Sequence, residues 1–294
     1  NTHLELNAKM TSFGGFEMPI QYSGVKKEHL TVRNNLGVFD VSHMGEFYVS
    51  GPNALPLLQY VCSNDISKIS VGKAQYNYLP NETGGIVDDL IIYRIEESSY
   101  LLVVNASNIL KDWKWIQKHN TSFNAKIEDR SEITALLAIQ GPKALEAMQK
   151  LTSSRLDELP YYAHTQGTFA GCQNTLIATT GYTGATGFEL YVHRNDALKI
   201  LKKLFSTHYN VEPIGLAARD TLRLEMGYCL HGNDITENTT PIESGLSWIV
   251  SKNKDFIGSN IIKKQISKGV DEHLIAFIIN DRGIPRKGYT ILNT

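Results

Sequence analysis

Several common features are missing from this sequence of 294 residues. It has only three cysteines, widely spaced and without a CxxC pair, so neither a disulfide framework nor a structural zinc site is expected. We expect three reduced, mostly buried thiols. The nine histidines are scattered, with no HExxH motif and no order typical of a serine hydrolase, so no metal is expected. No apolar run approaches the roughly 20 residues that a membrane helix needs.

An excess of charge of one sign is also missing. The 29 lysines and arginines nearly balance the 30 aspartates and glutamates, which gives a formal net charge of −1. A protein that binds nucleic acid by neutralising phosphates needs a basic excess, so that class is not favoured. The first ten residues lack the apolar core of a signal peptide. With 42% hydrophobic residues, the composition is that of a globular protein of a reducing compartment, and its length suggests about two domains.

The sequence does contain a series of strand-like runs followed by helix-like runs. Three such units are expected, at residues 46–50 with 51–59, 135–140 with 141–149, and 188–192 with 196–205. The first two share the pattern Gly-Pro-x-Ala-Leu, with proline expected in the first helical turn, where its missing N–H costs little. Hairpins are expected between residues 86–93 and 100–105, and between residues 175–179 and 188–192. Together these elements predict an α+β fold, with helices packed against antiparallel sheets.

The pattern changes after about residue 249. Residues 277–279 and 284–292 are typical of short strands separated by turns. A β-rich unit is expected to begin here, and the last residues fall within an expected strand. We therefore expect the natural protein to be longer.

Two acidic residues interrupt one predicted strand. Asp88 and Asp89 lie in the run Gly-Gly-Ile-Val-Asp-Asp-Leu-Ile-Ile-Tyr, although aspartate is a poor strand former. Neighbouring side chains of a strand point to opposite faces, so the two carboxylates cannot flank one bond as a glycosidase pair does. One is expected to face solvent or a strand end, and the other a pocket. Asp89 shares its face with Val87 and Ile91 and is the candidate for the pocket; the alternative is that both acids are exposed beside the glycine turn.

A glycine-rich segment is a second candidate for a ligand site. Residues 180–189 carry a glycine at every third position, which lets the backbone approach a ligand closely. Tyr182 lies in this segment, and Glu189 falls on the strand that follows. The alternative is a long hairpin turn.

A predicted helix and the polar segment after it are further candidates. Residues 215–227 place Arg219 and Arg223 on one helical face, either at a site or as surface residues paired with nearby acids. Residues 228–243 form a polar connection that is long enough to favour a functional loop.

Taken together, these segments resemble the aminomethyltransferase (T-protein) family of the glycine cleavage system. The resemblance covers essentially the whole chain and depends on the order and spacing of several blocks. They are Phe16-Glu-Met-Pro-Ile-Gln-Tyr22, Gly37-Val-Phe-Asp-Val-Ser-His-Met44, Gly84-Gly-Ile-Val-Asp-Asp89, Val104-Asn105, Gly181-Tyr-Thr-Gly184, Gly187-Phe-Glu189, Ala218-Arg-Asp220 and the run from His231 to Pro241.

The resemblance implies a three-domain cloverleaf around a central opening that holds folate. The first two would be α+β domains with antiparallel sheets, of ferredoxin-like or Greek-key type. The first would comprise residues 1–44 plus 134–240, and the second, inserted domain residues 45–133. The third, a β-barrel-like domain, would begin in residues 241–294 and be incomplete in this sequence.

The resemblance also implies a reaction and its partners. A lipoyl arm on H-protein carries an aminomethyl group on sulfur, and the methylene passes to tetrahydrofolate. Ammonia is released and 5,10-methylenetetrahydrofolate forms. Tetrahydrofolate is thus the expected co-substrate, and neither nucleic acid nor a membrane is an expected partner. The expected location is the bacterial cytoplasm, or the mitochondrial matrix for a eukaryotic protein.

The resemblance assigns roles to individual residues. Asp89 matches the family's catalytic carboxylate beside N10 of folate, where it can accept the N10 hydrogen and offset positive charge developing on the methylene. Glu189 and Arg219 match residues that hydrogen-bond the pterin, whose amino-pyrimidine edge suits a carboxylate. The other folate-pocket positions carry rings, a thioether or an amide to contact the flat ligand, and they are Tyr182, Tyr76, Met44 and Asn105. Asp88 is expected to be structural.

One position departs from the family's pattern, and two alternatives remain. The family's pattern is Gly-Tyr-Thr-Gly-Glu-x-Gly-Phe-Glu. In this chain Ala185 stands in place of the first Glu, so a loop contact changes, while Glu189 is retained. One alternative is a non-catalytic folate-binding factor for iron–sulfur cluster assembly, which carries a Lys-Gly-Cys-Tyr-x-Gly-Gln-type motif where this chain has Met226-Gly-Tyr-Cys-Leu-His-Gly232. The other is the folate domain of a dimethylglycine or sarcosine oxidase, which is fused to a flavin domain whose dinucleotide fingerprint is missing here.

Overall fold

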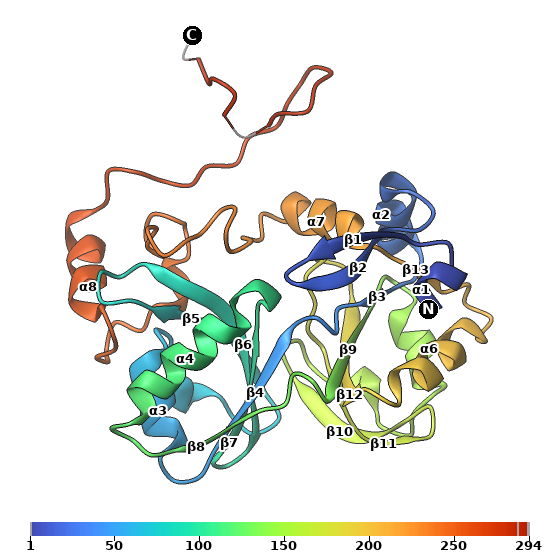
Figure 1. The fold of residues 1–294 in the computed structure, drawn as a ribbon, viewed down its shortest axis with the longest axis horizontal. Helices are drawn as coiled ribbons and strands as arrows, with labels where there is room; N and C mark the ends of the chain where they lie inside the picture. The colour runs from blue at the N-terminus through green and yellow to red at the C-terminus, as the bar shows by residue number, and fades with distance from the viewer. Residues whose placement is uncertain (1, 287, 293–294) are drawn as a thin grey trace.

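The computed structural model describes residues 2–286 and 288–292, and it confirms a mixed α+β fold built on antiparallel sheets (Figure 1). The chain leaves the first sheet after β3 (Gly37–Asp40), builds the second sheet from residues 45–129, and returns to the first in β9 (Thr134–Gln140). β3 and β9 are hydrogen-bonded neighbours, so this excursion begins and ends at adjacent strands.

The first sheet has the strand order β10-β11-β12-β9-β3-β13. Its other strands are β10 (His164–Phe169), β11 (Cys172–Ala178), β12 (Gly187–His193) and β13 (Glu212–Pro213). All neighbours are antiparallel except β13, which runs parallel to β3. Alternation along β9 sends Leu137 and Ile139 into a core with α5 (Ala144–Gln149) and α6 (Ala197–Phe205), and sends Leu136 and Ala138 to the opposite face.

The second sheet is antiparallel throughout, with the order β5-β6-β7-β4-β8. Its strands are β4 (Gly45–Ser50), β5 (Ala74–Pro80), β6 (Ile86–Glu96), β7 (Ser99–Val104) and β8 (Lys126–Asp129). One face packs on α3 (Ala54–Val61) and α4 (Ile109–Asn120). The other face, with Tyr93, Leu101 and Val103, packs on the first sheet's opposite face and on α2 (Val25–Asn34) and α7 (Leu216–Glu225). Both faces of the second sheet are therefore covered.

The remaining elements lie at the two ends of the chain and in short turns. They are α1 (Thr2–Glu5), the hairpin of β1 (Lys9–Phe13) and β2 (Phe16–Gln21), α8 (Ser259–Lys268), and 3₁₀ turns at Ile66–Lys68, Ala106–Asn108, Leu156–Glu158 and Ser247–Ile249. A further apolar cluster, which includes Tyr78, Ile86, Ile235 and Ile262, holds α8 and the segment before it against β5 and β6.

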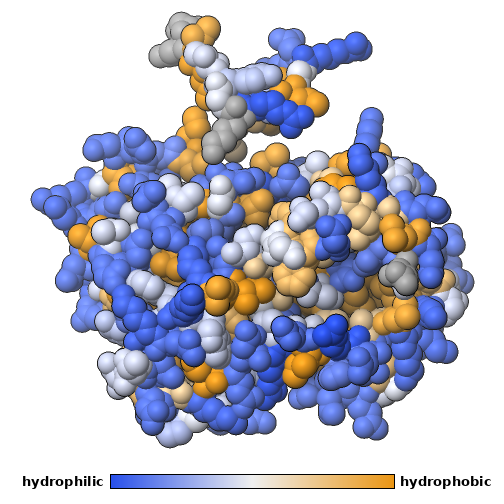
Figure 2. Space-filling model, in the orientation of Figure 1, coloured by the Kyte–Doolittle hydropathy of each residue, from blue (hydrophilic) through white to orange (hydrophobic). Residues whose placement is uncertain are grey.

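The expectation of strands at residues 277–279 and 284–292 is wrong for the part of them that the structure describes. The described residues beyond α8 form neither helix nor strand, and they run away from both sheets (Figure 1). A strand needs a partner for its backbone N–H and C=O groups, and no sheet edge is near this segment. Its apolar side chains, such as those of Phe277 and Ile278, are exposed, and Figure 2 shows hydrophobic residues on the extension.

Most of the other predicted elements are confirmed. β6 pairs with β7, and β11 pairs with β12, so both predicted hairpins are confirmed. The first two predicted helices begin at Ala54 and Ala144, so Pro52 and Pro142 lie in the turn before each helix and not in its first turn. The three cysteines are free and buried, as expected. In the described residues, no helix has both the length and the apolar character needed to cross a membrane.

Candidate active site

Strand β6 carries both candidate acids just after the glycine turn. Asp88 and Asp89 occupy opposite faces, as neighbours in a strand must. The expectation that one of them faces solvent or a strand end is wrong, because both faces of the sheet are covered. Asp88 is fully buried on the side of α4, and Asp89 is half-buried on the side of the first sheet. Asp88, and not Asp89, is the more deeply buried acid.

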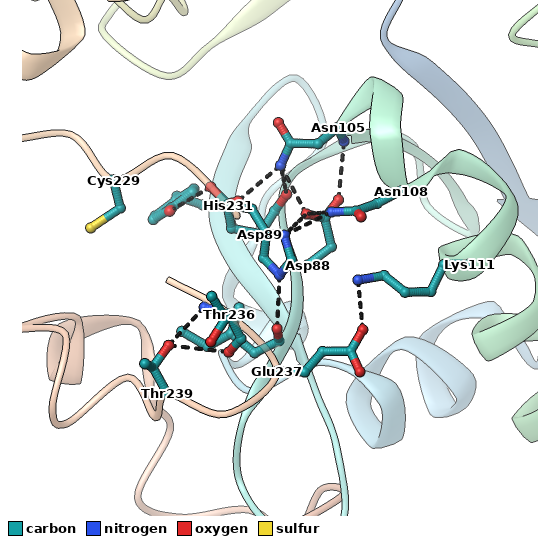
Figure 3. A network of polar contacts seen from close by, with 12 residues as sticks. Asp88, Asp89, Asn105, Asn108, Lys111, Cys229, His231, Thr236, Glu237 and Thr239 are labelled. Atoms are coloured by element: carbon teal, nitrogen blue, oxygen red, sulfur yellow. Dashed lines mark hydrogen bonds and ion pairs between the residues drawn. The ribbon is translucent and has the colours of Figure 1, made fainter. Parts of the chain in front are cut away.

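Three N–H groups surround the Asp88 carboxylate. Its Oδ2 accepts a hydrogen bond from the backbone N–H of Asn105 at 3.0 Å. Its Oδ1 accepts from Nδ2 of Asn105 at 2.9 Å and from Nδ2 of Asn108 at 2.6 Å (Figure 3). These bonds compensate the carboxylate for the loss of water. Asp88 thereby holds the connection between β7 and α4 against β6, which supports a structural role.

Asp89 is held through both of its oxygens. Oδ2 accepts from the hydroxyl of Tyr76, on the neighbouring strand β5, at 2.8 Å, and Oδ1 accepts from Nδ2 of Asn105 at 2.9 Å. The Asn105 amide therefore bridges the two acids. Burial, and then the charge of Asp88, raise the pKa of Asp89 to about 7, against the opposing effect of the bonds from Tyr76 and Asn105. A carboxyl group with a pKa near neutrality can accept and return a proton.

The polar loop of residues 228–243 packs against the beginning of β6 (Figure 3). Nε2 of His231 donates to the carbonyl of Ile86 at 3.0 Å, so Nδ1 is left to accept from Nδ2 of Asn108 at 3.0 Å. A Cβ atom at Gly85 would lie 1.8 Å from the carbonyl oxygen of Glu237, so only glycine allows this approach. The sequence did not identify His231 and Asn108 as members of the site. The length of the polar loop, which contains His231, was a signal that could have indicated His231.

A second group of predicted residues gathers around Tyr182. The guanidinium of Arg219 lies 4.7 Å from the centre of the Tyr182 ring, and its Nη1 is buried without a hydrogen-bond partner among the described residues. Glu189 is buried in β12, and its Oε2 accepts from Oγ1 of Thr180 at 2.5 Å. Burial lowers the pKa of Arg219, and the charge of Glu189 opposes this. A guanidinium edge that has no partner among the described residues, within electrostatic reach of a carboxylate, suits a planar polar ligand.

Tyr182 connects the two groups electrostatically. Its hydroxyl donates to the carbonyl of Cys229. Burial raises the pKa of Tyr182, the charge of Asp89 adds to the rise, and the charge of Arg219 opposes it. Tyr182 therefore lies within electrostatic reach of both groups. The structure thus brings Asp89, Tyr76 and Asn105 together in one hydrogen-bonded group, and Arg219, Tyr182 and Glu189 in a second.

Met44, His43 and Arg223 are the remaining polar or thioether residues of interest outside the two groups. Met44 is half-buried against the core between the two sheets. His43, which sequence reasoning missed, is buried with Nδ1 unpartnered in the described part of the chain; burial and then the charge of Arg219 lower its pKa to about 4, so the imidazole is neutral. Arg223 is buried and not at the surface. Its Nε donates to Asp220 at 2.8 Å and its Nη1 to Asp234, which anchors the polar loop to α7.

Comparisons with known proteins place this fold and site in a family. Residues 1–254 match the model of the GCVT N-terminal domain. The chain is 55% identical to the aminomethyltransferase of Phocaeicola vulgatus, over 99% of this chain and 82% of that protein. It is 44% identical to the aminomethyltransferase of Thermotoga maritima, over 99% and 80%. The crystal structure of glycine cleavage system aminomethyltransferase T from Bartonella henselae matches with a TM-score of 0.85 and 38% identity, over 91% of this chain and 73% of that one. The chain therefore belongs to the GCVT family and, within it, to the aminomethyltransferases.

Proposed function

We propose that this chain is an aminomethyltransferase of the glycine cleavage system that uses tetrahydrofolate as its co-substrate. The names of relatives that are 44% and 55% identical support the activity. Within the chain, one observation carries the proposal. Asp89 is a half-buried carboxylate with a pKa near neutrality, held by Tyr76 and Asn105 and within electrostatic reach of Tyr182, on which Arg219 packs.

The side chains of the two groups, together with Met44, suit a reduced pterin. Glu189 offers a carboxylate to the adjacent N–H donors of an amino-pyrimidine edge, and Arg219 offers to a ring acceptor a buried Nη1 that has no partner in the described part of the chain. Tyr76 and Tyr182 supply aromatic rings, and Met44 a thioether, to pack on the flat ring system. A buried donor without a partner is unfavourable in the free protein, and a ligand acceptor would remove that cost.

Asp89 is positioned to act where the one-carbon unit is exchanged. In the overall reaction, the methylene loses its bonds to sulfur and to the amine nitrogen, and it gains bonds to N5 and N10 of tetrahydrofolate. The hydrogens of N5 and N10 leave with the thiol and the ammonia. Ionised Asp89 accepts the N10 hydrogen and offsets positive charge on the methylene. Because Tyr76 and Asn105 already hold both carboxylate oxygens, the group is oriented before the substrate binds.

The proposal extends to partners, architecture and location. Lipoylated H-protein would supply the aminomethyl group, and the bacterial cytoplasm would be the location. Residues 1–44 plus 134–240, residues 45–133 and residues 241–294 would contribute to three domains of a cloverleaf, the third a β-barrel-like domain. The placement of the whole second sheet within residues 45–129 supports the boundaries of the second domain. An iron–sulfur cluster assembly factor is not favoured, because the curated relatives are named aminomethyltransferases.

The Asp89→Asn variant tests this function. Asparagine keeps the size of the side chain but cannot take up the proton. We expect kcat for methylenetetrahydrofolate formation from aminomethylated H-protein to fall about 10²–10⁴-fold, with a much smaller change in folate affinity. Asp255→Asn is the matched control, since Asp255 is exposed and pairs with Lys263. Activity of Asp89→Asn within a few-fold of wild type would remove Asp89 from the mechanism.

A further inference from the structure

Helix α4 buries an acid that the proposed mechanism does not use. Asn108, the residue just before α4, and Asp112 and Ile116 within it follow one another at intervals of four residues. All three are buried, so they form the stripe that faces the second sheet. Asn108, at the start of the stripe, donates to Asp88 at 2.6 Å. Asp112 follows one turn later, fully buried and within hydrogen-bonding reach of the same Asp88 carboxyl group. Two acids therefore meet inside the core.

The supply of donors shows which acid of the pair holds a proton. Asp88 receives three N–H donors, whereas neither oxygen of Asp112 has a donor among the described residues. The charge of the neighbouring Lys111 opposes the rise of the Asp112 pKa only in part, and its Nζ pairs with Glu237 at 2.8 Å. Two ionised carboxyl groups in contact would repel strongly in a core, and a single proton between them turns repulsion into a hydrogen bond. The acid without donors is the one that gains most from keeping the proton.

We propose that Asp112 is a neutral carboxylic acid whose O–H donates a hydrogen bond to the Asp88 carboxylate, and that it thereby positions the active-site carboxylate Asp89 through Asn105. The contacts run from Asp112 to Asp88, from Asp88 to Nδ2 of Asn105 at 2.9 Å, and from that nitrogen to Asp89 at 2.9 Å. Burial, and then the charge of Asp88, raise the pKa of Asp112 to about 11, in agreement with this assignment. The effect on Asp89 rests on the proposed function, whereas the proton on Asp112 does not.

A neutral Asp112 limits the negative charge around Asp89. The titratable groups that interact electrostatically with Asp89 are Asp88, Tyr76, Asp112, Tyr162, Tyr182 and Cys229. An ionised Asp112 would place a second charge beside that of Asp88 and would push the pKa of Asp89 still higher. The proton on Asp112 therefore helps to keep Asp89 ionisable near neutral pH.

The proton on Asp112 can be tested without an activity assay. Above an ordinary aspartate pKa of about 4 the unfolded chain has released this proton, while the folded chain keeps it, so the contribution of Asp112 to wild-type stability falls as pH rises. Asp112→Asn stays neutral in both states and retains an N–H donor for Asp88. Urea unfolding should show the unfolding constant of wild type, relative to that of Asp112→Asn, rising about tenfold per pH unit between about pH 5 and 8. A ratio that does not change with pH would overturn the proposal.

Infrared spectra and kinetics give two further readouts. At a pH above the Asp89 pKa of about 7, where Asp89 is ionised, wild type should show a protonated-carboxyl stretch that Asp112→Asn lacks and Asp255→Asn retains. The absence of such a difference would count against the proton on Asp112. Asp112→Ala, which has no donor, should lower kcat on the order of tenfold, whereas Asp112→Asn should keep kcat and the acid limb of its pH profile near wild type. If Asp112→Ala and Asp112→Asn are both folded and lose kcat equally, the positioning role of Asp112 would be overturned. If Asp89→Asn remained active, only the proposed function would fail, and the pH dependence of stability would still decide the protonation of Asp112.

Discussion

Asp88 and Asp89 show how surroundings give two neighbouring residues of one type different properties. Asp88 meets three N–H donors in the core, and Asp89 meets one amide and one hydroxyl at the side of the first sheet. The period of a strand predicts that they point to opposite faces. It does not predict that both faces are covered, or that one amide of Asn105 bridges both acids. These facts depend on which loops meet β6.

The hydroxyl of Tyr76 provides a test at the residue scale. Its hydrogen bond stabilises the ionised form of Asp89 and so lowers the pKa of that carboxyl group. Activity is expected to be lost as pH falls through the Asp89 pKa of about 7. In Tyr76→Phe this pKa rises, so the acid limb of the kcat–pH profile should move to higher pH by about one unit.

The measurement is kcat across the neutral pH range for Tyr76→Phe and for Tyr60→Phe. Tyr60 has an exposed ring and serves as the control. An acid limb that stays in place, or one that moves to lower pH, would show that Tyr76 does not tune Asp89.

At the scale of elements, the alternation of apolar residues and the turn residues in the sequence were sufficient to predict the hairpins of β6 with β7 and of β11 with β12. Helix α4 was not predicted, and the structure gives a reason. Its buried stripe contains Asp112 between Asn108 and Ile116, so the apolar period that marks a helix is broken where the helix is most buried. Helices α2 and α8 were also missed; each has few buried apolar side chains.

Gly85 tests the contact between two elements, β6 and the polar loop. In Gly85→Ala the new methyl group would lie 1.8 Å from the carbonyl oxygen of Glu237, so the loop must move and His231 must shift from Ile86. We expect a loss of about 1–3 kcal/mol in the free energy of unfolding, measured by urea titration, together with lower kcat. Gly283→Ala is the control, since a Cβ there has no atom within 4 Å. Equal stability of the two variants would show that the loop does not depend on this close approach.

At the scale of the whole molecule, the candidate site draws on segments that are far apart in the chain. β5, β6 and the connection after β7 supply Asp89 and its partners, while the glycine-rich segment, β12 and α7 supply the group around Tyr182. The family resemblance named the predicted residues of both groups in advance. It assigned no role to Asp112, His231 or His43, because their surroundings arise only when the two sheets, α4 and the polar loop pack together.

The most direct test of the central claim is a crystal structure of the chain with tetrahydrofolate bound. We predict that the amino-pyrimidine edge of the pterin contacts Glu189 and Arg219, that the ring packs on Tyr182, and that N10 lies within hydrogen-bonding distance of Asp89. Tetrahydrofolate bound away from Asp89, with Nη1 of Arg219 still unpartnered, would contradict the account.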